Sequence, residues 1–410
     1  MATAHTAAQT REQLVAAARE IAPAIAERAA DCETQRRLPA ETIVDFRRAG
    51  LLRALVAPAY GGYGLEIGTV IETSREIARA CGSSGWCLAI CTLHTDLASG
   101  FPQAARDEIF AERPDPVICG VFMPSGTATR ASDGWRLTGA WNFASTCDHA
   151  DFGLFAAVIN DPREGDPPVA SFALRRDQFS IVDNWHTAGL CGTGSKQVVI
   201  NDAVIADSHV MAVVPGTVRA GGGDRRDDGR LSAGLPGSSV ATLGLAGVAM
   251  GIALGALDRF EQRLKGKLRE GSFKDNDRQV AAQLRFSESA SEVDVAELLV
   301  LRDLDEMTAD TLAGRRSNEQ QRARYRRDAA WAIQACARAT ARLQPAAGAG
   351  SIMLADPLQR AVRDAQTISA HVVADLDGGH EAWARAPGAP RRRPPQLGTC
   401  AATGDEGSAS

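Results

Sequence analysis

The property of this chain that most limits its fold is a double change of hydrophobic periodicity along its 410 residues. Up to residue 116, apolar residues recur at spacings of three and four, as they do at Leu14, Ala18, Ile21 and Ile25. Short alternating or β-branched runs follow from residue 117, and long helical patterns return at residue 238. Helices on either side of a block of strands predict an α+β protein, because each element must bury its apolar face against another.

Residues 1–116 are predicted to form an N-terminal helical domain. Thr10 and Gln13 make a capping-box pattern at the start of its first helix. Gly50 and Gly82 follow later helical patterns at the position where glycine commonly ends a helix. We expect five helices, which begin near residue 10 and then cover 38–49, 69–80, 86–99 and a short stretch after Pro102.

Residues 117–215 are predicted to form a small antiparallel β domain, from the runs VICGVFM, GWRLTGAWNFAS, FGLFAAVI, VASFAL and KQVVIND. Residues 216–237 contain GGGDRRDDGR and are expected to be a loop or linker. Four long helical patterns predict a C-terminal four-helix bundle within 238–385, over 238–266, 276–304, 317–343 and 356–375. The tail, 386–410, is rich in Pro, Gly and Ser and is expected to be disordered.

One segment is apolar enough to suggest a membrane helix. Residues 240–257 read VATLGLAGVAMGIALGAL, with Gly247, Gly251 and Gly255 at a spacing found in membrane helix pairs. The segment is rich in Gly and Ala, stands alone and continues directly into charged residues. We interpret it as a closely packed interior helix of a protein that does not enter the membrane, and the glycines as positions of close helix approach in a bundle.

Charge and cysteine content narrow the class of function. The formal net charge is −5, and 45 Lys and Arg residues are mixed with 50 Asp and Glu residues, which argues against a nucleic-acid surface. The nine cysteines are irregularly spaced and form no C-x-x-C pair, which is typical of reduced thiols. The N-terminus lacks the basic and apolar regions of a secretory signal, so we expect a cytoplasmic protein.

Several common catalytic motifs are missing. No G-x-G-x-x-G follows a predicted strand, GTGSK at 192–196 has the wrong order for a phosphate-binding loop, and no H-E-x-x-H occurs. Cys87, Cys91 and His94 share a helical face, but thiols packed on a buried face explain this spacing better than a metal site does. We therefore expect no metal and no nicotinamide site in this chain.

Four strings, in this order and spacing, resemble the acyl-CoA dehydrogenase fold. They are PAYGGYG (58–64), GWRLTGAWNFAS (134–145), WHTAGLCGTGS (185–195) and PLQRAVRDAQTISAH (357–371). The resemblance extends from about residue 10 to 385. It does not extend to dehydrogenation, because Val372 and Ala241 stand where dehydrogenases of this fold carry their glutamate base.

The details resemble the flavin-dependent monooxygenase branch of that fold, which includes two-component aromatic hydroxylases, polyketide hydroxylases and amino-sugar N-oxygenases. SSGWCLAICTLH (83–94) is similar to their helix that carries a Trp and, eight residues later, a His. WNFAS (141–145) is similar to the strand whose Ser meets the flavin, and RDAQTISAH (363–371) to the helix whose His acts as a base.

This resemblance implies a flavin site of small and aromatic side chains. Ser145 would hydrogen-bond flavin N5 and the C4a-hydroperoxide, and Phe143, on the same side of the strand, would pack on the ring. Thr193, Gly194 and Ser195 would bring backbone N–H groups and hydroxyls to the flavin. The alternative for these three residues is an ordinary turn between a loop and a strand.

His371 is the candidate base. Asp364, Thr367 and His371 would share one face of the last long helix, and imidazole suits deprotonation of a phenol near neutral pH. Trp86 would line the flavin or substrate pocket, with core packing as the alternative. His94 would either hydrogen-bond a substrate hydroxyl or be a core histidine.

The function that the resemblance implies is that of the oxygenase component of a two-component flavin-dependent monooxygenase. A separate flavin reductase would supply FMNH2 or FADH2, O2 would be the cosubstrate, and a phenolic or polycyclic aromatic compound would be hydroxylated. Two alternatives stay open: N-oxygenation of an amine on the same scaffold, and a catalytically inactive flavin- or acyl-CoA-binding protein. A homotetramer built through the C-terminal helices is also implied.

Overall fold

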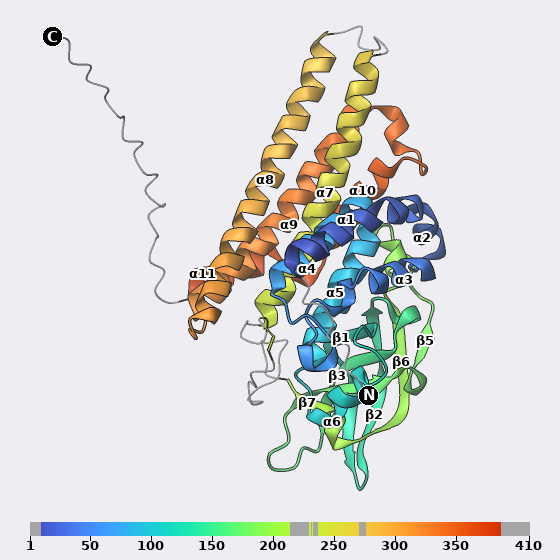
Figure 1. Ribbon diagram of the computed structural model, residues 1–410, viewed down its shortest axis with the longest axis vertical. Coiled ribbons are helices and arrows are strands. Elements are labelled where there is room, and N and C mark those ends of the chain that lie inside the picture. Colours follow the sequence, from blue (N-terminus) through green and yellow to red (C-terminus); the bar gives the residue numbers. More distant parts are fainter. Residues whose placement is uncertain (1–9, 214–228, 231, 233–236, 270–275, 387–410) are drawn as a thin grey trace, which may run out of the picture.

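The computed structural model describes residues 10–213, 229–230, 232, 237–269 and 276–386. Within them, helices come first, a sheet follows and further helices complete the chain, which confirms the expected order (Figure 1). The helices are α1 (Arg11–Glu27), α2 (Ala29–Gln35), α3 (Ala40–Arg48), α4 (Ile67–Ala80), α5 (Gly82–Ala98), α6 (Gln103–Phe110), α7 (Gly237–Arg269), α8 (Asn276–Leu312), α9 (Glu319–Ala347), α10 (Pro357–Ser369) and α11 (Leu376–Arg385). The predicted linker and tail lie almost entirely outside the described residues.

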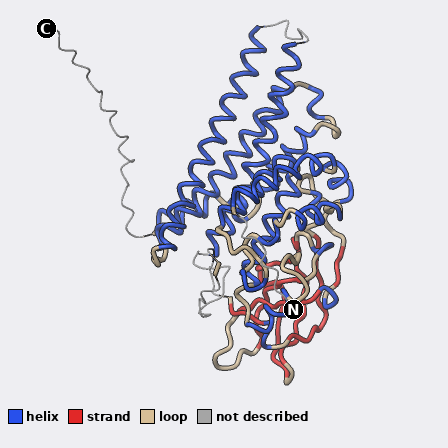
Figure 2. The backbone as a smooth tube through the Cα atoms, in the orientation of Figure 1, coloured by secondary structure: helices blue, strands red, loops and turns tan. Residues whose placement is uncertain are grey.

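The strands of the described residues form one sheet at one end of the molecule, away from the long C-terminal helices (Figure 2). They are β1 (Ile118–Ala131), β2 (Gly134–Ala144), β3 (Phe152–Asn160), β4 (Val169–Arg175), β5 (Ser180–Val182), β6 (Lys196–Ile205) and β7 (Val210–Ala212). Their order across the sheet is β5-β6-β2-β1-β3-β4-β7. Large buried aromatic side chains fill the core of the sheet, among them Trp135, Trp141, Phe155 and Phe172.

The prediction of a purely antiparallel sheet is wrong at one pair of strands. β1 and β3 run parallel, with Ile118 opposite Phe152, whereas the other described pairs are antiparallel. β2 turns back onto one side of β1, and the chain then crosses through a 3-10 turn at Cys147–His149 to the other side. The sequence pattern does not reveal this direction, because side chains alternate between faces in both kinds of strand pair.

The segment that suggested a membrane span is helix α7, in the interior of the helical part. It is long and apolar enough to span a membrane by composition, but 89% of its apolar window is buried inside the molecule. A Cβ atom added to Gly247, Gly251 or Gly255 would lie 2.3 to 2.6 Å from a backbone oxygen of α4. The close approach that these glycines predict is therefore made within the chain, between α4 and α7.

Single residues define two helix boundaries in the N-terminal part of the chain. The capping box predicted at Thr10 and Gln13 is present. Gly82, expected to end the third helix, instead begins α5, and α4 already ends at Ala80. A Cβ atom at Gly82 would lie 2.7 Å from a carboxylate oxygen of Asp364 on α10, so a side chain would not fit at this junction.

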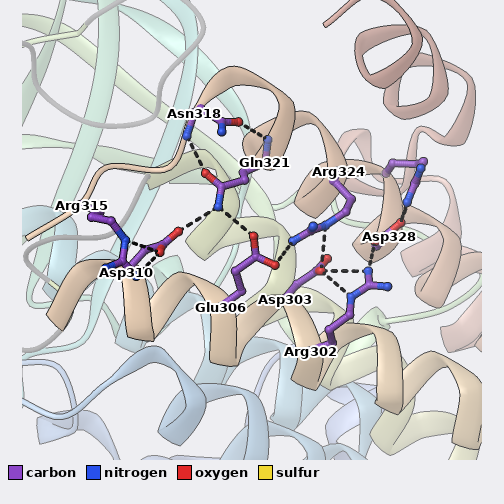
Figure 3. A network of polar contacts seen from close by, with 10 residues as sticks. Arg302, Asp303, Glu306, Asp310, Arg315, Asn318, Gln321, Arg324 and Asp328 are labelled. Atoms are coloured by element: carbon purple, nitrogen blue, oxygen red, sulfur yellow. Dashed lines mark hydrogen bonds and ion pairs between the residues drawn. The ribbon is translucent and has the colours of Figure 1, made fainter. Parts of the chain in front are cut away.

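A network of charged and amide side chains fastens α8 to α9 (Figure 3). Asp303, which is fully buried, accepts a hydrogen bond from Arg302 at 2.9 Å and pairs with Arg324 at 3.2 Å. Burial and the nearby Asp328 raise the pKa of Asp303 to about 7. Gln321, at the start of α9, donates to two carboxylates of α8 at 2.8 Å each. The network holds the two long helices side by side.

Candidate active site

Four of the predicted site residues, Trp86, Ser145, Thr193 and Ser195, are joined in one chain of hydrogen bonds. Ser145 directly follows β2, and Thr193 and Ser195 come from the loop that precedes β6. Ser145 Oγ lies 2.7 Å from Ser195 Oγ, which in turn lies 2.7 Å from Thr193 Oγ1. The indole N–H of Trp86, on α5, donates to Ser145 Oγ at 3.0 Å. All four side chains are buried, so water does not compete for these bonds.

The far end of this chain fixes its direction. Thr193 Oγ1 donates at 2.9 Å to the carbonyl oxygen of Leu190, which can only accept. Each hydroxyl has a single hydrogen, so Ser195 must donate to Thr193, and Ser145 must donate to Ser195. The hydrogen of Ser145 is thus directed into the protein, and one lone pair of its oxygen is left for a further donor.

The 185–195 loop contains residues in the left-handed backbone region. Leu190 has φ +50° and Gly194 has φ +53°. A leucine in this region costs roughly 1–2 kcal/mol, so its surroundings must hold it there. The Leu190 carbonyl also accepts from Thr193 N–H at 3.1 Å and from Trp185 Nε1–H at 3.2 Å. Thr146 N–H, just after β2, donates to the Thr193 carbonyl at 2.9 Å and ties the loop to the sheet.

Phe143 is the exposed member of the predicted set. Its side chain is 70% exposed, whereas Ser145 is 5% exposed. The expectation that both face one side of a regular strand is wrong, because the β2–β6 register shifts between Trp141 and Ala144 and Phe143 has φ +69°. Its ring meets the edge of Trp185, with 6.0 Å between centroids. An aromatic ring held exposed by a strained backbone is a candidate ligand contact.

His371 lies beyond the end of α10, so the predicted helical face shared with Asp364 and Thr367 is wrong for the histidine. α10 ends at Ser369, and β-branched residues that disfavour a helix follow at 372 and 373. His371 instead caps a 3-10 turn, η9 (Val372–Ala374). Val372, at the position of the dehydrogenase base, is 68% exposed.

The ring of His371 meets that of Trp86 edge to face, with centroids 5.2 Å apart. Trp86 therefore contacts both Ser145 and His371. Burial lowers the pKa of His371 below its usual value, so the ring is neutral near pH 7. Its Nδ1 accepts Val373 N–H at 3.3 Å, which places the proton of the neutral ring on Nε2.

His94 is buried on α5 against β1. Its Nδ1–H donates to the Ile118 carbonyl at 2.9 Å, which leaves Nε2 as an acceptor. The ring meets Phe122 edge-on, with 5.4 Å between centroids. Burial lowers the pKa of His94 to about 4, so the ring is neutral at pH 7. His94 lies about 12 Å along α5 from Trp86 and outside the hydroxyl chain.

The cysteines of this region act as packing groups. In the described residues all eight cysteines are free thiols, and all are buried. Cys87, on α5, donates to the Thr193 carbonyl, and Cys91 contacts Thr146 Oγ1. Burial raises the pKa of both thiols. No three His, Cys, Asp or Glu side chains are grouped for a metal ion in the part of the chain that the structure describes.

The sequence pattern does not identify two residues of this region. Trp185 links Phe143 to Leu190, and its place at the start of the WHTAGLCGTGS string could have pointed to it. Asp364 is buried on α10, and its Oδ1 accepts Leu190 N–H at 2.6 Å. Burial raises the pKa of Asp364 to about 7. An aspartate beside an arginine on an amphipathic helix is usually solvated, so no sequence signal indicates this burial.

Comparison with known proteins identifies the family. Residues 8–105 match the acyl-CoA dehydrogenase N-terminal domain, and residues 243–376 match the acyl-CoA dehydrogenase C-terminal domain. The chain is 30% identical over 393 residues to the FADH(2)-dependent resorcinol hydroxylase, oxygenase component, of Rhizobium sp. (strain MTP-10005), a match that covers 92% of this chain and 95% of that protein. The chain belongs to the flavin-dependent monooxygenases of the acyl-CoA dehydrogenase fold.

Solved structures agree with this membership. The HsaA monooxygenase from Mycobacterium tuberculosis matches this monooxygenase with a TM-score of 0.85 and 27% identity, over 92% of this chain and 97% of that one. XiaF from Streptomyces sp., solved in complex with FADH2 and glycerol, matches with a TM-score of 0.81 and 26% identity, over 91% and 94%. Both matches span the helical parts and the sheet together.

The residues of this monooxygenase fit a reduced flavin. An isoalloxazine ring needs a flat apolar contact and polar partners along its edge. The exposed ring of Phe143, beside Trp185, offers such a contact. The hydroxyls of Ser145, Ser195 and Thr193 offer hydrogen-bonding groups whose positions are already set by one another.

Proposed function

We propose that this monooxygenase is the oxygenase component of a two-component system that hydroxylates a phenolic or polycyclic aromatic substrate. A separate reductase supplies reduced flavin. One atom of O2 enters a C–H bond of the substrate and the other leaves as water, with the two electrons supplied by the reduced flavin when it is bound. The observation that carries the proposal is the double contact of Trp86, which joins the Ser145 hydroxyl to the His371 imidazole.

The role that we assign to Ser145 is to hydrogen-bond the reduced flavin at the place where O2 reacts, which we call the oxygen side of the reaction. Its Oγ receives the Trp86 N–H, and its own hydrogen goes to Ser195. To donate to a bound flavin, Ser145 must release Ser195, and the chain can then reverse so that Thr193 donates to Ser195 and Ser195 to Ser145. Reversal removes only one of the three hydrogen bonds that the Leu190 carbonyl accepts. Such a net loss is worth about 0.5–1.5 kcal/mol.

The role that we assign to His371 is to orient and deprotonate the phenol, which we call the substrate side of the reaction. Its neutral ring presents Nε2–H, which can donate to a phenol oxygen and orient it. To take the phenol proton, the ring must give up the long Nδ1 bond to Val373 N–H, through a change of tautomer or by protonation at Nδ1. That weak bond costs about 0.5–1.5 kcal/mol to break, a small part of what a general base contributes.

The remaining predicted residues shape the pocket. Trp86 and Phe143 supply aromatic surface, the first to the substrate and flavin side, the second to the flavin face. Thr193, Gly194 and Ser195 hold the polar edge of the flavin. His94 offers Nε2 as a hydrogen-bond acceptor for a substrate hydroxyl at the β1 end.

We further propose a cytoplasmic homotetramer that assembles through the C-terminal helices. α8 carries five exposed large apolar side chains along its length, Val280, Leu284, Val295, Leu298 and Leu312, which are 43%, 59%, 45%, 67% and 72% exposed. α8 lies at the edge of the bundle (Figure 1). A second copy of the chain that covers this stripe would remove it from water, which is the usual fate of a row of exposed apolar residues on one helix.

A single-turnover experiment tests the proposed function. The protein is loaded anaerobically with FADH2 or FMNH2 and mixed with ¹⁸O2 and a panel of phenols, with resorcinol as the first probe, and of amines. We expect a hydroxylated phenol that carries one ¹⁸O atom. An N-oxygenated amine would favour the alternative reaction on this scaffold. Recovery of all reduced oxygen as hydrogen peroxide with every compound would count against the proposal.

A further inference from the structure

One buried carboxylate that has no role in the proposed reaction contacts the 185–195 loop, which contributes Thr193 and Ser195 to the site. Asp364 lies in the middle of α10 and is 4% exposed. Its Oδ1 accepts Leu190 N–H at 2.6 Å. Neither the oxygen side nor the substrate side of the proposed reaction uses this side chain.

The contact with Asp364 is one of several contacts between α10 and the loop. Arg363 donates from its guanidinium to the Ala188 carbonyl. A Cβ atom at Gly189 would lie 2.2 Å from the Arg363 carbonyl oxygen, so the loop backbone rests directly on the helix. Three successive loop residues, 188 to 190, thus touch two successive residues of α10. Of these contacts, only the one to Asp364 holds the backbone N–H of the left-handed residue, Leu190.

Leu190 connects the contacts of α10 to the hydroxyl chain, because its N–H donates to Asp364 and its carbonyl accepts from Thr193. Its carbonyl oxygen accepts from the Thr193 hydroxyl at 2.9 Å, and this bond sets the direction of the hydrogens of Ser195 and Ser145. If Leu190 left the left-handed region, its carbonyl would turn away from Thr193, whose backbone N–H and hydroxyl both donate to it. Thr193 and Ser195 would then lose the support that places their hydroxyls beside Ser145. The chain of contacts from Asp364 to Ser145 therefore runs through one strained residue.

We propose that Asp364 is a positioning residue for Ser145: it holds Leu190 in the left-handed conformation and so keeps the Thr193–Ser195–Ser145 hydroxyls in register. The proposal rests on the proposed function of Ser145. It requires an acceptor oxygen at this place and not a negative charge, because a neutral carboxyl or amide oxygen can also accept Leu190 N–H. This requirement separates Asp364 from a residue that acts through its charge.

The first test needs no flavin. Hydrogen–deuterium exchange of the 185–195 segment is measured in the full chain for the wild type, Asp364→Ala, Asp364→Asn and Asp356→Ala. Asp356 caps the same helix through Leu358 N–H at 2.8 Å but does not touch the loop, so its variant controls for general weakening of α10. We expect exchange of the Leu190 amide to rise roughly 10- to 100-fold in Asp364→Ala and to stay near the wild-type rate in the other two variants.

The second test measures how the reduced oxygen is divided between hydroxylated product and hydrogen peroxide. In single turnovers, Asp364→Ala should release hydrogen peroxide in place of product, Asp364→Asn should restore product, and Ser145→Ala/Asp364→Ala should be no worse than Ser145→Ala alone. Unchanged exchange in Asp364→Ala, or equal changes in Asp356→Ala, would overturn the positioning role. Unchanged product yield in Ser145→Ala would instead overturn the proposed function of Ser145, whatever the exchange of the loop shows.

Discussion

Trp86 and His371 meet edge to face, with ring centroids 5.2 Å apart and ring planes at 73°. The same indole donates its N–H to Ser145. One rigid side chain therefore sets the separation between the hydroxyl that we assign to the oxygen side of the reaction and the imidazole that we assign to the substrate side. The two roles can be told apart, because removal of each group should fail in a different way.

Ser145→Ala should still bind reduced flavin but should release hydrogen peroxide in place of product. A hydrogen bond to a developing charge in a dry site contributes about 100- to 1000-fold, and a neutral one about tenfold. Peroxide and product are quantified after a single turnover. Ser180→Ala is the matched control, because this exposed serine of the same sheet lies on β5 and donates to the Val199 carbonyl, outside the hydroxyl chain. The control should keep the wild-type yield of product per flavin. Equal peroxide release in both variants would contradict the role of Ser145.

His371→Ala should slow hydroxylation by about 100- to 10,000-fold without raising peroxide release to the same extent. Because burial holds its pKa below the usual value, the wild-type rate should fall only as the pH drops below about 6.5. In the variant, the rate should rise toward the pKa of the phenol, near 10, where solution ionisation replaces the base. His371→Asn separates the base from the turn, because an amide oxygen can still accept Val373 N–H. A wild-type pH profile in His371→Asn would show that the ring is not the base.

The sequence predicts which residues converge at the candidate site better than it predicts the local backbone that holds each of them. Trp86, Ser145 and His371 come from strings far apart in the chain and do converge. The end of α10 is missed because no glycine or proline marks it; the stop depends on two valines and on the cap that His371 provides. The register shift at Phe143 is missed because a bulge interrupts an alternating pattern without changing its composition.

The sequence pattern also does not predict which helix or loop packs against a given helix. Gly247, Gly251 and Gly255 predict a close neighbour for α7, but small residues do not specify which helix approaches, and the neighbour is α4. The burial of Asp364 depends on the loop that crosses α10, and that loop is distant in sequence. Both features arise from contacts between segments more than 150 residues apart, and local periodicity carries no information on such contacts.

Leu284→Asp combined with Leu298→Asp should lower the mass of the assembly, because two charges would be placed in the middle of the exposed α8 stripe. Light scattering coupled to size-exclusion chromatography measures the mass directly. Val44→Asp is the control, since Val44 is 57% exposed but lies on α3, away from the C-terminal helices. Flavin binding is followed in parallel. A wild-type mass in the double variant would show that α8 does not form the interface.

Asp364→Asn should stabilise the protein at alkaline pH and not at acid pH. The pKa of Asp364 is about 7 in the folded protein, against an ordinary value of 3.8, because burial disfavours its charge. Cys81 and Glu33 act in the same direction, and Arg360 opposes them. Since the folded state holds this proton more tightly, stability falls as the pH rises from about 4 to about 7 and stays low above that.

The asparagine variant lacks this titration, so its advantage over the wild type should grow through the same window, by on the order of 4 kcal/mol at most. Urea unfolding of both proteins at pH 4, 5.5 and 9 measures the difference, and other titrating groups cancel in it. A difference that is the same at all three pH values would mean that Asp364 carries its charge in the folded protein as easily as in the unfolded chain. The hydrogen bond to Leu190 would then be one to a solvated carboxylate, whose loss the loop could tolerate.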